Sequence, residues 1–204
     1  RSGLESVEKC SNEEERNHFL HLMSEETVHM KRLIDDMLLL ANSDADTLTI
    51  KPEACQPDLL LLDTYEKFEP LAKKNGLHLI LTLPEEILPD CFCDIHRTEQ
   101  IFSIIVDNAL CYTPSGGKVT LSCHAENEML CFLFKDTGCG ISEEKKSHIF
   151  ERFYRADDAH TDREHFGLGL CIAKELTEKQ NGNIQVVDAP ISGSCFMVQL
   201  PCAL

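Results

Sequence analysis

The chain has 204 residues, of which 43% are hydrophobic and 26% are charged. This length and balance are typical of a globular protein with one ordinary domain and a smaller element, and they exclude wholesale disorder. The 19 Lys and Arg residues stand against 35 Asp and Glu residues, which gives a formal net charge of −16. No run of Lys or Arg exceeds two residues. We therefore expect binding neither to nucleic acid nor to an anionic membrane surface.

The apolar runs of the sequence are short. Runs such as residues 37–41 and 104–106 fall far below the ~20 residues that span a bilayer. The N-terminal residues 1–9 are polar and do not resemble a signal peptide. These features predict a cytoplasmic chain.

The chain contains 11 cysteines, but none form a C-x-x-C pair and only Cys91 and Cys93 are close in sequence. Cys and His pairs at zinc-finger spacing are also missing. We interpret the cysteines as reduced thiols that act as small core hydrophobes. A redox or metal protein built on them is the least favoured alternative.

The first predicted element is a long helix over residues 13–45. Ser11 is interpreted as its N-cap, and residues 13–15 are acidic, as the helix dipole favours. A stripe of apolar residues follows alternating spacings of four and three: Phe19, Met23, Met30, Leu33, Met37 and Leu40. Such a stripe indicates a helical hairpin or a coiled-coil-like bundle. The alternative is a helix that packs on its own domain.

Residues 42–58 are polar and contain Pro52 and Pro57, which predicts a break between domains. We divide the chain into residues 1–45, a linker over 46–57, and a second domain over 58–204. The pattern of the second domain predicts helices over residues 58–75, 94–111 and 168–180. It predicts strands over residues 77–83, 91–93, 118–125, 129–135, 184–187 and 195–200, with a hairpin around Asn127. The sum is an α+β fold, an α/β sandwich with three helices on one face of a mixed, mostly antiparallel sheet.

Four short segments of this domain carry residues suited to chemistry: 107–109, 136–141, 149–155 and 166–170. Asn108, on an apolar helix, offers an oxygen to a hard cation such as Mg²⁺. Asp136 ends a strand and can accept a hydrogen bond from an amino group. Each residue alone also has an ordinary structural interpretation, as a polar helix position or a turn.

The glycines and arginines of these segments fit a phosphate ligand. Gly138 and Gly140 let the backbone approach a ligand closely. Gly167 and Gly169 precede a helix N-terminus, whose free N–H groups attract phosphate. The positive charges that lie near them in sequence belong to Arg152 and Arg155.

In this order the four segments resemble the N-box, the first glycine box, the F-box and the second glycine box of bacterial two-component sensor histidine kinases. Residues 28–41 resemble the second helix of the dimerisation and phosphotransfer hairpin of that family. The resemblance covers nearly the whole chain. It implies a Bergerat-type ATP-binding fold, shared with gyrase, after the helix of a truncated hairpin. It also implies an enzyme that donates the γ-phosphate of ATP to a histidine for relay to a response regulator.

The resemblance assigns roles residue by residue. Asn108 would ligate Mg²⁺, and Asp136 would bind the adenine amino group. Arg155, with Arg152 as the alternative, would contact the terminal phosphate. The other residues that the resemblance places around the nucleotide are Tyr112, Gly138, Gly140, Ile141, Phe166, Gly167, Leu168, Gly169 and Leu170. Gly167, Leu168 and Gly169 would also form the hinge of a mobile lid over residues 156–166.

The sequence departs from the family pattern at several positions. Ile104 replaces a frequent Asn, Cys111 replaces a frequent Lys, and Glu164 and His165 replace frequent glycines. We expect these changes to weaken nucleotide affinity or to stiffen the lid. They motivate the alternative of a degenerate nucleotide-binding or scaffold module. A third alternative is an anti-sigma serine kinase of the ATPase superfamily that histidine kinases share with gyrase. The long helix over residues 13–45 argues against this alternative.

None of the nine histidines stands in the H-E-x-x-x-P context of the family's phosphoacceptor. His18 and His21 are interpreted as solvated helix positions. The expectation is a fragment that begins just past the phosphoacceptor and does not phosphorylate itself. The expected partners are ATP or ADP, a response-regulator receiver domain and a second copy paired through the N-terminal helix. The parent protein is expected to be anchored in the bacterial plasma membrane.

Overall fold

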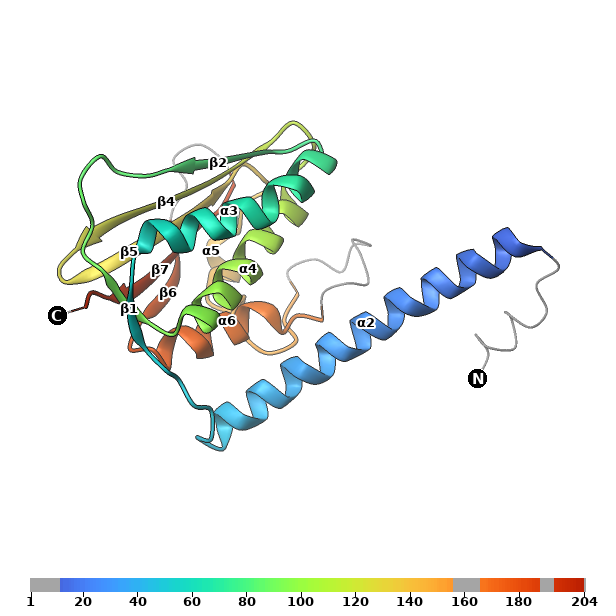
Figure 1. Cartoon of the computed structure of the whole chain (residues 1–204), viewed down its shortest axis with the longest axis horizontal. Helices are drawn as coiled ribbons and strands as arrows, with labels where there is room; N and C mark the ends of the chain where they lie inside the picture. The colour runs from blue at the N-terminus through green and yellow to red at the C-terminus, as the bar shows by residue number, and fades with distance from the viewer. Residues whose placement is uncertain (1–11, 156–165, 188–192, 204) are drawn as a thin grey trace.

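The computed structural model describes residues 12–155, 166–187 and 193–203. Figure 1 shows a long N-terminal helix, α2, that leads into a sandwich of helices packed on a sheet. None of the described helices combines the length and the apolar character that a membrane crossing requires.

Helix α2 spans Glu13–Asp44 as one uninterrupted element, as the apolar stripe predicted. Its N-cap is Asn12, whose side-chain oxygen accepts a hydrogen bond from the Glu15 backbone N–H at 2.8 Å. The interpretation of Ser11 as the cap was therefore wrong, and Ser11 itself lies outside the described residues. The acidic first turn lies at the positive end of the helix dipole, where it stabilises the helix.

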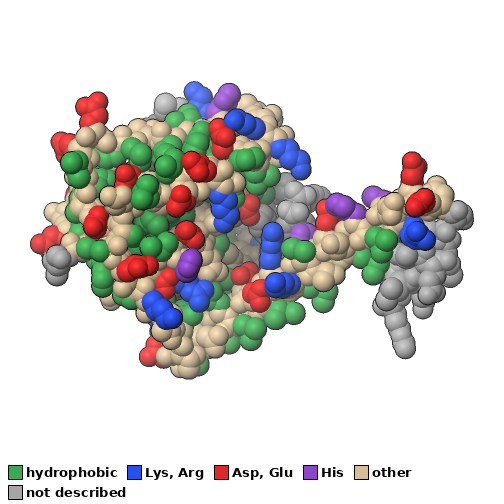
Figure 2. Space-filling view, viewed as in Figure 1, with side chains coloured by type: hydrophobic (Ala, Val, Ile, Leu, Met, Phe, Trp, Pro, Cys, Tyr) green, Lys and Arg blue, Asp and Glu red, His purple; other side chains and the backbone are tan. Residues whose placement is uncertain are grey.

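Only the C-terminal end of α2 packs against the sandwich, where it meets α6 (Gly169–Glu178). Leu39, Leu40 and Ser43 are buried there. Three residues of the apolar stripe are exposed, Phe19, Met30 and Met37, and so are five further apolar residues of α2: Leu20, Leu22, Val28, Ile34 and Leu38. Figure 2 shows hydrophobic side chains along the edge of α2 that faces away from the sandwich. These eight residues are therefore not covered by the described part of the chain.

A short strand, β1 (Glu53–Cys55), lies inside the predicted linker and was not predicted. It pairs antiparallel with β3 (Cys91–Cys93), with Glu53 opposite Cys93 and Cys55 opposite Cys91. Three residues are too few to show a period of two, and β1 exists because β3 offers it a partner. The end of the predicted linker is therefore part of the folded sandwich.

The main sheet has five strands in the order β2-β4-β5-β7-β6. β2 runs parallel to β4 and every other pair is antiparallel, which confirms the predicted mixed sheet. The β4–β5 hairpin turns at Asn127 and Glu128, both at positive φ, as a two-residue loop requires. The strands are β2 (His78–Thr82), β4 (Lys118–Glu126), β5 (Met129–Asp136), β6 (Asn183–Val187) and β7 (Cys195–Pro201).

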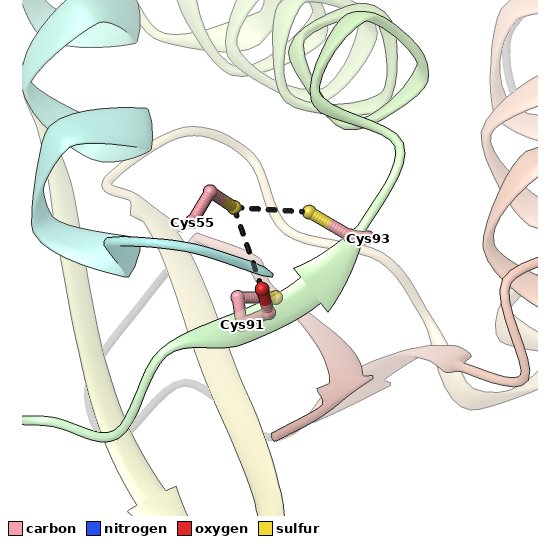
Figure 3. A group of neighbouring side chains, drawn as sticks. All are labelled: Cys55, Cys91 and Cys93. Atoms are coloured by element: carbon pink, nitrogen blue, oxygen red, sulfur yellow. Dashed lines mark hydrogen bonds between the residues drawn. The ribbon is translucent and has the colours of Figure 1, made fainter. Parts of the chain in front are cut away.

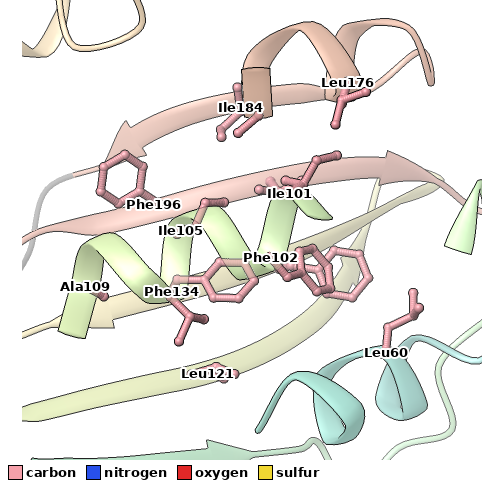
Figure 4. Packing of buried hydrophobic residues seen from close by; sticks show 14 of the residues in the cluster. Leu60, Ile101, Phe102, Ile105, Ala109, Leu121, Phe134, Leu176, Ile184 and Phe196 are labelled. Atoms are coloured by element: carbon pink, nitrogen blue, oxygen red, sulfur yellow. The ribbon is translucent and has the colours of Figure 1, made fainter. Parts of the chain in front are cut away.

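Three helices, α3 (Pro57–Lys74), α4 (Ile95–Tyr112) and α6, cover one face of the sheet, as predicted (Figure 1). The remaining helix, α5 (Glu143–Lys146), is a single turn. Phe102 of α4 packs on Phe132 of β5, with ring centroids 4.8 Å apart. It also packs on Phe134 of β5, with ring centroids 4.9 Å apart (Figure 4). This aromatic contact fixes α4 on the centre of the sheet, and so fixes the position of its last turns.

Candidate nucleotide-binding site

Asp136 is the last residue of β5, and its side chain is only 4% exposed. Its Oδ1 atom accepts hydrogen bonds from the backbone N–H of Gly138 at 2.7 Å and of Ser194 at 3.1 Å. Burial raises the pKa of this carboxyl group, and the hydrogen bonds from Gly138 and Ser194 act in the opposite direction. The result is a carboxylate with a fixed orientation at the end of a rigid strand.

Two glycines let the backbone close around this carboxylate. A Cβ atom on Gly138 would lie 2.4 Å from the backbone oxygen of Tyr112. A Cβ atom on Gly193 would lie 2.1 Å from the backbone oxygen of Asp136, and its φ of +86° is itself suited to glycine. Gly140 also has positive φ, +77°, and faces the backbone of Gly193. The predicted residues Gly138 and Gly140 are thus brought together with Asp136 and the end of α4.

The sequence does not indicate that Gly193 and Ser194 contact Asp136. They lie 57 and 58 positions after Asp136 and meet it only because β7 pairs with β5. The available signal was a Gly-Ser pair directly before the last strand, which by itself indicates nothing more than a turn.

The last two turns of α4 carry the predicted cation ligand. Asn108 is half-buried, and its Nδ2 donates a hydrogen bond to the backbone oxygen of Ile104 at 2.9 Å. This bond orients the amide, so Oδ1 is the atom available to a cation. Tyr112 ends the helix with 42% of its surface exposed. The first turn of α6 lies alongside, since a Cβ atom on Gly169 would lie 3.2 Å from Cγ2 of Ile104.

The second glycine segment is anchored to the F-box segment. Gly167 has a φ of +73°, and its backbone oxygen accepts a hydrogen bond from the Phe153 N–H at 3.0 Å. A Cβ atom at Gly167 would lie 2.8 Å from the backbone oxygen of Tyr154. Leu168 is buried, whereas Phe166 is 40% exposed. These contacts fix one end of the predicted lid; residues 156–165, including Glu164 and His165, lie outside the described part of the chain.

Ile141 and Leu170, the remaining predicted pocket residues, are partly buried and pack against the edge of the hydrophobic core. Both therefore have a structural role beside the predicted one.

The two predicted phosphate-binding arginines have different surroundings. Arg152 forms a bidentate ion pair with Asp44 of α2, with N–O distances of 2.8 and 2.6 Å, and its Nη2 lies 3.9 Å from Glu175. Asp44 raises the pKa of this guanidinium further above its already high value. Arg155 is exposed and directly precedes residue 156. In this conformation Arg152 connects helix α2 to the sandwich.

Comparison with known proteins identifies the family. Residues 93–204 match the family described as "Histidine kinase-, DNA gyrase B-, and HSP90-like ATPase". The adaptive-response sensory kinase SasA of Rippkaea orientalis is 32% identical over 187 residues, which are 91% of this chain and 47% of that protein. The sensor protein SrrB of Staphylococcus aureus is 33% identical over 185 residues, 89% of this chain and 31% of that protein. The chain thus spans less than half the length of these relatives.

Solved structures agree with these sequence matches. Full-length ShkA in complex with AMPPNP superposes with a TM-score of 0.81 and 25% identity, over 98% of this chain and 42% of that one. The Acinetobacter baumannii histidine kinase AdeS superposes with a TM-score of 0.76 and 20% identity, over 100% of this chain and 93% of that one. Together with the carboxylate and glycines at the end of β5, these matches show that the chain belongs to the histidine kinase-, DNA gyrase B- and HSP90-like ATPase family, as a sensor histidine kinase catalytic domain.

Proposed function

We propose that this chain is the ATP-binding catalytic part of a sensor histidine kinase and donates the γ-phosphate of ATP to a histidine of a phosphotransfer hairpin. The observation that carries the proposal is the buried Asp136 carboxylate, held by the N–H groups of Gly138 and Ser194. The ShkA structure, whose title describes a complex with AMPPNP, supports an adenine nucleotide as the ligand.

Asp136 gives the site its preference among bases. A carboxylate accepts a hydrogen bond from the amino group of adenine, whereas guanine presents a carbonyl oxygen at the same place. Two acceptor oxygens that face each other in a buried site repel, and the carboxylate oxygen that faces the base is left without a donor from it. This difference is a strong basis for discrimination between adenine and guanine. We therefore expect ATP and ADP to bind and GTP to be rejected.

The phosphates would lie between the end of α4 and the start of α6. Asn108 offers Oδ1 to Mg²⁺, and this fits because its Nδ2 is already bound to Ile104. The cation would neutralise charge on the phosphate oxygens. Tyr112 would flank the phosphates, and Gly167, Leu168 and Gly169 would hinge the lid. Arg155 would contact the terminal phosphate.

The acceptor histidine of the reaction is proposed to come from a hairpin outside these residues, because no histidine here has the H-E-x-x-x-P context. The test is incubation of this chain with Mg²⁺, γ-labelled ATP and an intact hairpin of the parent kinase. We expect label on the hairpin histidine. Label should be absent with Asp136→Asn, and also when the acceptor histidine is replaced by Ala. A folded chain that binds ATP but never labels the hairpin would contradict the proposal.

That contradictory result would support the second candidate, a degenerate module that binds nucleotide without transfer. One contact favours it: Ile104 stands where the family often has Asn, and its methyl group lies against the position of Gly169. An apolar group at this junction supplies no ligand to a cation or phosphate. If Ile104 weakens the binding of the cation or the phosphates, Ile104→Asn should raise the rate of phosphoryl transfer to the hairpin.

We also propose a domain division and partners for this chain. Residues 1–45 would be the hairpin helix, 46–57 the linker and 58–204 the ATP-binding domain. A second copy would cover the exposed apolar residues of α2. A response-regulator receiver domain would take the phosphoryl group, as the solved complex of ThkA with the response regulator TrrA suggests. The parent protein would be anchored in the bacterial membrane.

A further inference from the structure

Three cysteines meet on one face of the two-stranded ribbon formed by β1 and β3. Cys91 and Cys93 are two positions apart on β3, so their side chains point to the same face. Cys55 of β1 lies directly opposite Cys91 in the antiparallel register. Figure 3 shows the sulfurs of Cys55 and Cys93 pointing toward each other, with Cys91 beside them on β3. The cluster is remote in sequence, with 35 residues between Cys55 and Cys91, which explains why cysteine spacing did not indicate it.

The distances in this cluster suit a shared ion. The three Sγ atoms all lie within 4.8 Å of one another, and those of Cys55 and Cys93 are 3.4 Å apart. Thiolates bound to one tetrahedral zinc ion, with Zn–S bonds of about 2.3 Å, are about 3.8 Å apart. The Cys55–Cys93 separation of 3.4 Å is close to that value, and the 4.8 Å limit on the other two separations keeps all three sulfurs within reach of one ion.

The surroundings combine a protected interior with one accessible side. Cys91 and Cys93 are fully buried, whereas Cys55 is only partly buried. An ion could therefore enter past Cys55, and a water molecule could complete its coordination there. The nearest carboxylate in sequence, Asp94, already accepts hydrogen bonds from the backbone N–H groups of Lys51 and Arg97. The described donor set is thus made of sulfur alone.

We propose that Cys55, Cys91 and Cys93 form a binding site for one thiophilic d¹⁰ metal ion, with Zn²⁺ as the expected occupant. Sulfur ligands select Zn²⁺ or Cu⁺ over Mg²⁺ and Ca²⁺, which prefer oxygen. Binding replaces three S–H bonds by three metal–sulfur bonds and releases the three protons to solvent. No electron is transferred.

The ion would connect two parts of the chain. β1 follows the segment that leaves α2, and β3 runs directly into α4, the helix that carries Asn108. The hydrogen bond from Lys51 N–H to Asp94 Oδ2, at 2.9 Å, already joins the same two segments. A bound ion would tie the linker strand to the ATP-binding domain, and it would raise thermal stability with the logarithm of the free ion concentration once that exceeds the Kd.

The test is a competition titration of the reduced, chelator-treated chain with Zn²⁺ against a chromophoric chelator, with Cu⁺ in a parallel arm. We expect one ion per chain. Cys55→Ser and Cys93→Ser should each weaken binding by more than the ~100-fold that loss of an outer-shell partner can cost. Cys202→Ser is the matched control, because Cys202 is half-buried and bridged to Cys91 through its backbone, yet lies outside the group of three. Tighter binding of Cu⁺ than of Zn²⁺, lost in the same two variants, would assign Cu⁺ as the occupant and keep the site.

A second measurement on the unmutated chain covers the case that the variants do not fold. Zn²⁺ should protect Cys55 from alkylation, read by mass spectrometry, while the exposed Cys139 stays reactive. The proposal is overturned if neither ion binds stoichiometrically, if Cys55 labels equally with and without metal, or if a Cys55–Cys93 disulfide forms in the reduced preparation. None of these readouts uses nucleotide, so their failure would leave the proposed kinase function untouched.

Discussion

The buried position of Asp136 has a cost in stability when its carboxyl group is ionised. Because burial raises the pKa of its carboxyl group, the unfolded chain gives up this proton at a lower pH than the folded chain does. The contribution of Asp136 to stability therefore falls as the pH rises from the usual aspartate range through the raised value.

This leads to a prediction for Asp136→Asn. The side-chain oxygen of Asn can still accept from Gly138 and Ser194, so the variant should have a Tm at neutral pH equal to or above that of the unmutated chain. The difference should shrink as the pH is lowered below about 4. Thermal unfolding followed by circular dichroism measures it. A large loss of Tm in Asp136→Asn would instead mark the carboxylate as a structural group.

A second prediction concerns the close backbone contact at Gly138. Gly138→Ala would place Cβ 2.4 Å from the Tyr112 backbone oxygen, which neither backbone can avoid without moving. We expect a loss of about 1–3 kcal/mol in the free energy of unfolding, as for other overpacked sites. Gly169→Ala is the matched control, since its new methyl group would meet only the Ile104 side chain at 3.2 Å. Equal losses in the two variants, measured by denaturant unfolding, would contradict this assignment.

At the scale of elements, the end of α2 is joined to the sandwich by polar contacts. Arg152 pairs with Asp44, and the Ser43 hydroxyl donates to Glu175 at 2.7 Å. The hydrogen bonds from Arg152 lower the pKa of Asp44. A lowered pKa means that the pair stabilises docking above the usual aspartate range, and that this stabilisation is lost as the pH falls through the lowered value.

We therefore expect Arg152→Ala to loosen α2 from α6 and to speed proteolysis within residues 46–52. Lys31→Ala is the control, because Lys31 is an exposed cation of α2 more than three turns before Asp44. ATP should have the same loosening effect only if Arg152 contacts the terminal phosphate, since that contact must break the pair with Asp44. No change in proteolysis with Arg152→Ala would show that the pair does not hold the helix.

The elements differ in how far the sequence predicts them. α2, α3, α4 and α6 have apolar faces of helical period, and the paired strands alternate, so their existence followed from local pattern. β1 has only three residues and forms because it pairs with β3. No local sequence pattern reveals that pairing. The same limit applies to the site. Asp136, Gly138 and Asn108 carry motif signals, whereas Gly193, Ser194 and the cluster of Cys55, Cys91 and Cys93 arise only when distant strands pair.

At the scale of the whole molecule, the exposed apolar side of α2 is the feature that the single chain leaves unexplained. It extends from Phe19 to Leu38 along a helix whose buried residues, Leu39, Leu40 and Ser43, all lie in its last two turns. A contiguous apolar surface of this kind is typical of an association face. The proposed homodimer would cover it with the same face of a second copy.

Met30→Glu is expected to shift the chain toward monomer, because it places a charge in the middle of this face at a residue that is 57% exposed. Arg32→Glu changes charge at an exposed position on the opposite side of the helix and should leave association unchanged. Sedimentation equilibrium measures both. An unmutated chain that stays monomeric at all concentrations would rule out the homodimer through α2 for this chain.

We propose above that Asp136 anchors an adenine nucleotide whose phosphates reach a cation on Asn108. Calorimetric titration of ADP and ATP, with and without Mg²⁺, into the unmutated chain and into Asp136→Asn tests it most directly. We expect saturable one-to-one binding that Mg²⁺ strengthens for the unmutated chain and no binding for a folded Asp136→Asn. Absence of binding to the unmutated, folded chain, or equal binding to both, would contradict it.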